Sequence, residues 1–157
     1  MPTTHQQHPV PESIRTLAAL TDLDYIDLFT LTTADAADWS PEQWARAMFV
    51  DVAGLGGQFI FRVLLGMQLA WRRSPDHVAG WRITGRGDDW IRLAARSWMV
   101  TGRLVVRVVD GEVSLATCVR YDRPIGARVW TVLSAKHRAV APDLLQEAHD
   151  VLRSRST

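Results

Sequence analysis

The chain has 157 residues, of which 47% are hydrophobic and 22% are charged. This size and composition are those of one globular domain, and they exclude disordered and fibrous proteins. The formal net charge is +1, so the overall charge gives no reason to expect a nucleic acid or an anionic membrane surface as a partner. The single cysteine, Cys118, excludes an internal disulfide and a cysteine-based zinc cluster, and it suits a reducing compartment.

Both ends of the chain are polar. Residues 1–12 contain no apolar run after a basic start, so we expect a flexible tail and no signal peptide. The longest apolar stretch, residues 59–69, is interrupted by polar residues and is shorter than the roughly 20 residues that a membrane span needs. Residues 154–157 should fray. We therefore expect a single domain over residues 13–153, no membrane span and a cytoplasmic location.

The first predicted elements are one strand and two helices. Residues 24–33 combine aromatic and β-branched side chains and predict a strand. Ser40, followed by Pro41 and by Gln43 three residues after the cap, predicts the start of a helix with a capping box. This helix should end before the nearby cluster of glycines. A second helix, apolar nearly all round and therefore buried, is expected over residues 58–69.

Four short runs of strand-forming residues follow and predict an antiparallel meander. The runs are residues 78–84, 89–98, 101–109 and 112–121. The Asp110-Gly111 pair between the last two is typical of a type I′ hairpin, because that turn needs positive φ at both central residues. Alternation along the runs predicts one buried sheet face and one solvent-exposed face rich in arginine.

After Pro124, apolar residues recur every three or four positions and predict a long helix with one continuous face. That face comprises Trp130, Leu133, Ser134, His137, Ala141, Leu144, Ala148 and Val151. Pro142 lacks a backbone donor, so the helix is either kinked there or divided in two. The order of elements predicts an α+β fold in which a curved, mostly antiparallel sheet wraps around the C-terminal helix.

Several stretches resemble a known family. The more specific ones are Val78-Ala79-Gly80-Trp81 and Arg120-Tyr121-Asp122-Arg123-Pro124. Others are Asp24-Tyr25, Ser40 to Arg46, Leu64-Leu65-Gly66, Asp88 to Leu93, Ser114 to Thr117 and Ser134 to Arg138. On these residues the chain resembles the domain of unknown function 2867 family, a branch of the START-like helix-grip superfamily that also contains polyketide cyclases and ligand carriers. The resemblance covers nearly the whole chain from about Ser13 onward.

This resemblance implies a helix-grip fold and a cavity more than it implies a reaction, because the family has no settled activity and fold does not fix function. Similar domains hold a hydrophobic ligand between the concave face of the sheet and the C-terminal helix. The chain departs from the expected pattern at Ala94, where relatives tend to place a glutamate. Alternation points Ala94 outward, so the change leaves the expected cavity intact but weakens any function based on that acid.

Two residues are candidates for catalysis. His137 falls on the helix face that looks toward the expected cavity, where an imidazole can act as a general base near neutral pH. The sequence shows no partner for it, so a structural histidine bonded to a local acceptor is the favoured interpretation. Tyr121, at an inward position of the last strand, is the candidate hydrogen-bond donor. The charged residues on either side of Tyr121 are interpreted as a structural ion-pair cluster.

The candidate ligand contacts share the inward positions of the strands or the apolar face of the C-terminal helix. They are Trp81, Ser97, Leu104, Val106, Thr117, Trp130 and Ser134. Core packing is the competing interpretation for each of them. Trp90 and Trp98 fall on the solvent-exposed face and are candidates for a homodimer interface.

The sequence lacks dinucleotide-binding, P-loop, nucleophile-elbow and zinc-protease motifs, and its histidines are scattered. We therefore expect no cofactor, no metal site and no nucleic-acid partner. Three functions stay open. The leading one is binding of a small hydrophobic or amphipathic molecule. The alternative is a cofactor-independent cyclase, dehydratase or isomerase that uses His137 and Tyr121, and the third is a protein-interaction domain with a filled core.

Overall fold

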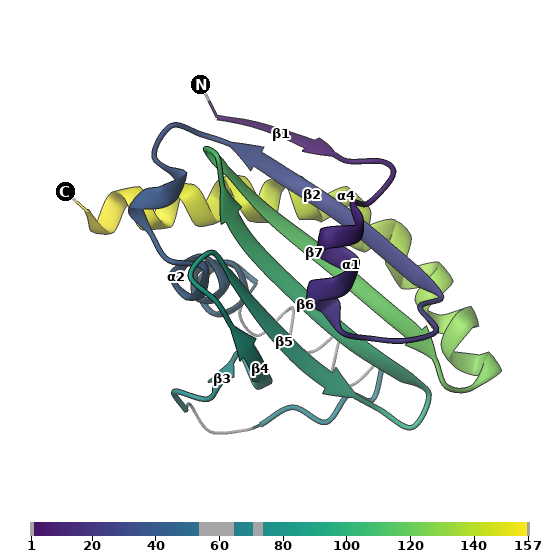
Figure 1. Ribbon diagram of the computed structural model, residues 1–157. Coiled ribbons are helices and arrows are strands. Elements are labelled where there is room, and N and C mark those ends of the chain that lie inside the picture. Colours follow the sequence, from purple (N-terminus) through teal and green to yellow (C-terminus); the bar gives the residue numbers. More distant parts are fainter. Residues whose placement is uncertain (1, 54–64, 71–73, 157) are drawn as a thin grey trace.

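The computed structural model describes residues 2–53, 65–70 and 74–156 (Figure 1). These residues form an α+β fold with a curved seven-stranded sheet in the order β1-β2-β7-β6-β5-β4-β3, and every pair of neighbours is antiparallel. The strands are β1 (Thr3–Gln6), β2 (Tyr25–Thr32), β3 (His77–Val78), β4 (Trp81–Arg86), β5 (Trp90–Arg96), β6 (Val100–Val109) and β7 (Glu112–Tyr121). The predicted class, an antiparallel sheet with a long C-terminal helix, is confirmed.

The hairpin between β6 and β7 forms as predicted. Asp110 and Gly111 have φ values of 54° and 75°, which are the positive values that this turn needs at both central residues. β7 has the predicted bounds. The turn fixes the residue at which β7 begins, and it thereby fixes the register between β6 and β7.

The single strand predicted over residues 78–84 is wrong. The chain reverses at Ala79 and Gly80, both at positive φ, so β3 and β4 form a hairpin there. A Cβ at Gly80 would lie 2.8 Å from Cβ of Leu69 and 2.9 Å from the carbonyl oxygen of Ala70, so glycine is required. Alanine rarely adopts a positive φ, so nothing in the sequence indicated a turn at Ala79. The apolar residues around it therefore resembled one continuous strand.

The first predicted helix begins as expected. In α2 (Pro41–Arg46), the Ser40 hydroxyl accepts a hydrogen bond from the Gln43 N–H and the Gln43 side chain accepts one from the Ser40 N–H, which confirms the capping box. The helix continues as a π-helix, η2 (Ala47–Val52). Of the second predicted helix, residues 58–64 lie outside the described residues. Residues 65–69 are not helical, so the predicted end of that helix is wrong.

The segment expected to be a tail also carries structure. Within the expected tail, β1 pairs with β2. α1 (Glu12–Ala18), where no element was predicted, begins at the end of that tail and packs on the outer face of the sheet (Figure 1). α1 closes a second, smaller core on that face, so the prediction of a uniformly solvent-exposed outer face is wrong. Its buried members are Ile14, Ala18, Leu28, Val105, Ala116 and Cys118. A helix of seven residues is too short for its periodicity to show in the sequence.

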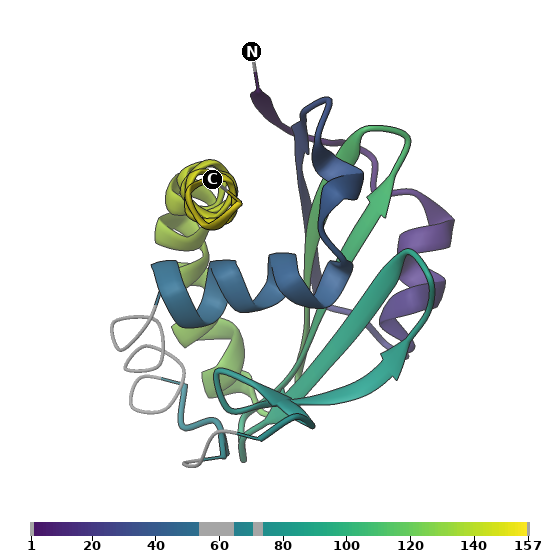
Figure 2. The ribbon, with the colours of Figure 1, turned by 90° about the vertical axis from the view of Figure 1, so that its left-hand side faces the viewer.

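The main core lies on the concave side of the sheet, beneath α4 (Pro124–Arg155). Figure 2 shows α4, α2 and η2 together on this side and α1 on the other. α4 is one continuous helix that contains Pro142, and its N-terminal part runs at an angle to its C-terminal part (Figure 2). None of the helices in the described ranges is long and apolar enough to cross a membrane.

Candidate functional site

A cavity of about 380 Å³ opens between α4, η2 and the concave face of the sheet. This volume is within the range of small-molecule sites. Its apolar wall consists of Phe49, Val52, Ala53, Leu104, Trp130, Leu133, Val140 and Leu144. Lys136, Asp143 and Glu147 also line it and are exposed, so charged side chains surround the mouth while the interior is apolar.

The π-helix η2 shapes one side of this cavity. The Ala53 N–H donates to the carbonyl oxygen of Met48, five residues earlier, at 2.9 Å. The wider turn keeps Met48 fully buried while Phe49 and Val52 reach the cavity wall. π-helical turns are rare in proteins as a whole. Those that occur are often found at functional sites.

His137 lines the cavity and faces a buried carboxylate. Its Nε2 atom lies 3.3 Å from Oδ2 of Asp27, and the exposed fractions of the two side chains are 16% and 2%. Asp27 lies on β2 and points to the concave side, beside its strand partner Thr117 on β7. The separation is that of an ion pair when the imidazole is protonated. A carboxylate this deeply buried is costly without such partners.

Tyr25 and Arg138 extend this group to the surface. The Tyr25 hydroxyl donates a short hydrogen bond to Oδ2 of Asp27, and the Arg138 guanidinium donates to the Tyr25 oxygen at 3.2 Å. Burial, and then the hydrogen bond to Asp27, raises the pKa of Tyr25 well above its ordinary value. The phenol therefore stays protonated and holds the carboxylate of Asp27 in place through Oδ2, the same oxygen that faces His137.

Several polar atoms around Trp130 are buried and have no hydrogen-bond partner among the described residues. They are Oδ1 of Asp27, Oγ1 of Thr117, Nε1 of Trp130 and Nε2 of His137. The Trp130 ring lies 5.7 Å from the His137 ring and 5.4 Å from the Tyr25 ring, centroid to centroid. Of these four residues, Trp130 and His137 line the cavity. An unsatisfied buried polar group costs about 1–3 kcal/mol, so these two favour a bound molecule that brings hydrogen-bonding groups of its own.

The predicted site residues divide into those on the cavity and those away from it. Leu104, Trp130 and His137 line the cavity, and Thr117 lies beside Asp27. Trp81, Val106 and Ser134 are buried side chains outside this lining. The Ser134 hydroxyl donates to a carbonyl oxygen of its own helix.

Ser97 and Tyr121 lie elsewhere. The Ser97 hydroxyl accepts hydrogen bonds from the N–H groups of Met99 and Val100 and so closes the turn between β5 and β6. Tyr121 is at the end of β7, where burial and then the charge of Asp24 raise the pKa of its phenol. The lining described above does not include either residue.

The sequence analysis missed Asp27 and Tyr25. Their positions carried a signal, because an aspartate stands at an inward position of β2 between Tyr25 and Phe29, which face the main core. The imperfect alternation of this strand concealed its inward face. Only the packing of α4 over β2 brings Asp27 to His137.

The two tryptophans considered for a dimer interface differ. Trp90 packs over Gly85 and Gly87, and the Arg92 guanidinium lies 5.6 Å from its ring centroid. Trp98 is 65% exposed. Trp98 alone of the pair therefore keeps the exposure that an interface residue needs.

No group of three or more side chains in the described ranges has an arrangement that could hold a metal ion. No protein-family model matches the chain, and comparison with curated proteins gives no match. The function is therefore argued from the geometry of the cavity and its polar end.

Proposed function

We propose that this protein binds a small, largely apolar molecule with at least one hydrogen-bonding group, in the cavity between the sheet and α4. The observation that carries the proposal is an apolar cavity whose wall includes His137 and Trp130, next to the buried carboxylate of Asp27. The apolar wall supplies affinity, and the few polar groups orient the ligand. The exposed charges at the mouth suit an amphipathic molecule whose polar end reaches solvent.

The proposal includes a START-like helix-grip fold. It is supported by the seven-stranded antiparallel sheet and by a long C-terminal helix that lies across its concave face (Figure 2). The cavity lies between this helix and the sheet, which is where the resemblance implied that a ligand would be held.

The test uses the dye 1-anilinonaphthalene-8-sulfonate, an apolar molecule with one anionic group, titrated into the full chain and followed by fluorescence. We expect one saturable site. Leu133→Trp fills the cavity and should weaken dye binding by roughly tenfold or more. Val132→Trp is the matched control, because Val132 immediately precedes Leu133 on α4 and is 73% exposed. The proposal fails if the wild-type protein does not bind, or if the Leu133→Trp and Val132→Trp variants bind the dye equally well.

Catalysis is the second candidate, and the Asp27–His137 pair favours it. A carboxylate beside an imidazole fixes the orientation of the ring, which can then accept a proton from a bound molecule. In a cofactor-independent cyclase, dehydratase or isomerase, His137 would be the base and Asp27 a positioning residue. Tyr121 is replaced in this account by Tyr25, which bonds to Asp27.

Native mass spectrometry of the purified protein, followed by denaturing extraction, separates the two candidates. A molecule that co-purifies is incubated with the wild-type protein and with His137→Gln, and its conversion is followed by mass. A catalyst should convert the molecule and lose about 100-fold in rate in the variant. A carrier should return it unchanged from both proteins.

A further inference from the structure

A second hollow, of about 540 Å³, lies on the outer face of the sheet, opposite the apolar cavity. Four adjacent strands each contribute one arginine to its lining: Arg82 from β4, Arg96 from β5, Arg103 from β6 and Arg120 from β7. The hollow lies where β5 and β7 end and β6 begins.

The strand register explains why these side chains converge. Arg82 pairs with Ala94, and Ala94 pairs with Arg103, so the three form one row across the sheet with an alanine at its centre. Arg96 pairs with Thr101, which pairs with Arg120, and these form the next row. Neighbouring strands are about 4.8 Å apart, so the guanidinium groups of Arg82 and Arg103 can reach a common point above the Ala94 methyl group.

Most of this positive charge is not neutralised. In the described part of the chain, Arg82, Arg96 and Arg103 form no ion pair with a carboxylate, whereas Arg120 pairs with Asp122 at 3.0 Å. Burial, and then the charges of neighbouring arginines, lowers the pKa of Arg103, although a guanidinium still remains protonated. Like charges at neighbouring positions of a sheet destabilise the fold, so an anion between them would be stabilising.

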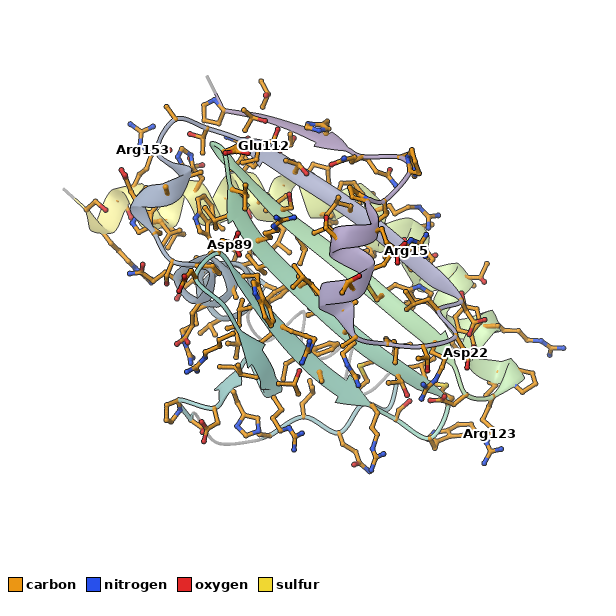
Figure 3. All side chains as sticks on the ribbon, viewed as in Figure 1. Arg15, Asp22, Asp89, Glu112, Arg123 and Arg153 are labelled. Carbon is orange, nitrogen blue, oxygen red and sulfur yellow. The ribbon has the colours of Figure 1, made fainter. Side chains whose placement is uncertain are left out.

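The hollow also contains a polar ring atom without a hydrogen-bond partner in the described part of the chain. His77 lines it, and the Nδ1 atom of His77 is buried and has no hydrogen-bond partner among the described residues. The acidic residues Asp89 and Glu112, labelled in Figure 3, lie at the opposite ends of β5 and β7 from the hollow. At the hollow itself, Asp122 contacts Arg120 and Thr101, which leaves Arg82, Arg96 and Arg103 without a carboxylate partner among the described residues.

Arg92 shows what a structural arginine on this face looks like. Its guanidinium donates hydrogen bonds to the carbonyl oxygens of Leu17 and Thr84 and to the Thr84 hydroxyl. Arg82 and Arg96 have no hydrogen bond of this kind among the described residues, and Arg103 donates only to the carbonyl oxygen of Gly102 next to it. Their donors are therefore available to a ligand.

We propose that this hollow is a second binding site, which holds the phosphate group of a small phosphorylated molecule on Arg82, Arg96 and Arg103. A phosphate accepts paired hydrogen bonds from planar guanidinium groups, and several arginines around one concave point match a dianion. A nucleic acid would need a longer basic track than this hollow, on a chain whose net charge is only +1. The site is independent of the apolar cavity and of the function proposed for it.

The test is calorimetric titration of the full chain, at low ionic strength, with inorganic phosphate and separately with a phosphate monoester, glucose 6-phosphate. We expect saturable binding of the monoester that weakens as salt is added. If free phosphate binds as tightly as the ester, the phosphate group alone is the ligand; if the ester binds more tightly, the hollow also contacts the organic part. Both results support the site. Absence of binding of either at millimolar concentration would overturn the proposal.

The matched variants are at Ala94. Ala94→Glu places a carboxylate between Arg82 and Arg103 and should weaken phosphate binding by roughly tenfold or more, whereas Ala94→Gln has a similar size without the charge and should retain more of the affinity. Dye binding in the apolar cavity should be unchanged in both variants, which checks the fold, and Ala94→Glu should melt at a temperature no lower than Ala94→Gln does, because its carboxylate offsets the charge of the arginines. Equal affinity of the two variants, or tighter binding of a single-stranded oligonucleotide than of the ester, would contradict the proposal.

Discussion

α4 carries two histidines that each face an aspartate, and their surroundings differ. His149 is 1% exposed, and its Nε2 atom lies 2.8 Å from Oδ1 of Asp35. Its ring stacks on Trp44 at 6.0 Å, with an angle of 8° between the planes, and meets Trp39 edge to face. This pair ties the C-terminal half of α4 to the segment after β2.

His137 has an aspartate partner too, but it lies on a cavity wall. Its separation from Asp27 is longer, at 3.3 Å, and buried atoms without a hydrogen-bond partner in the described ranges occur in both pairs, at Oδ1 of Asp27 and at Nδ1 of His149. His149 and Asp35 show that a buried pair of a histidine and an aspartate is not by itself a sign of function. Access to a cavity distinguishes the candidate site from the structural pair.

The largest effect should come from the structural pair. His149→Ala removes a fully buried ring between two tryptophans and should lower the free energy of unfolding by about 3 kcal/mol, measured by urea denaturation. Dye binding by the folded fraction should be unchanged, because His149 is outside the cavity lining. A loss of dye affinity without a loss of stability would show that His149 acts on the cavity and is not a purely structural residue.

A smaller loss is expected for Tyr25→Phe. The change removes the hydroxyl that donates to Asp27 and accepts from Arg138, and it leaves a buried carboxylate with one partner fewer. We expect a decrease of about 2 kcal/mol in the free energy of unfolding. Tyr121→Phe is the control, because the Tyr121 hydroxyl is not bonded to Asp27. Equal losses in the two variants would show that the Tyr25–Asp27 bond is not the cause.

The structural pair should also make stability depend on pH. Burial alone would raise the pKa of Asp35, but hydrogen bonds from Thr33 and then His149 hold it below its ordinary value. A carboxyl group whose pKa is lowered by folding stabilises the protein above its unfolded pKa of about 4, and this stability is lost as the pH falls through the folded value.

Asp35→Asn should therefore flatten the fall of unfolding free energy below about pH 4, measured by denaturation at several pH values. The pKa of Asp122 is also lowered, mainly by a hydrogen bond from Thr101 and to a smaller extent by one from Arg120. Asp122 should therefore leave some dependence of stability on pH in the Asp35→Asn variant. An unchanged pH profile in the Asp35→Asn variant would show that the Asp35 contacts do not stabilise the folded state.

The smallest effect on stability is expected for His137→Gln, below about 1 kcal/mol, because glutamine keeps a polar group at a partly exposed position. Dye affinity should change more than stability does, since the side chain lines the cavity. Fluorescence titration and urea denaturation of the same preparation give both quantities. A loss as large as that of His149→Ala would make His137 a second structural residue and weaken the functional interpretation.

Features that depend on neighbouring residues could be predicted from the amino-acid pattern alone. The capping box at Ser40, the Asp110-Gly111 turn and the long helix after Pro124 all follow from interactions within a few residues, so the pattern of the chain is sufficient to predict them. The class of fold then followed from their order.

The other features depend on contacts between segments that are distant in the sequence. β1 and α1 are too short to show a pattern, and β1 is held by backbone pairing with β2, to which side-chain identity contributes little. The chain reversal at Ala79 depends on a positive φ at an alanine, which the sequence pattern does not predict. Asp27 meets His137, and four arginines meet across four strands, because sheet register and helix packing join segments that are distant in the sequence.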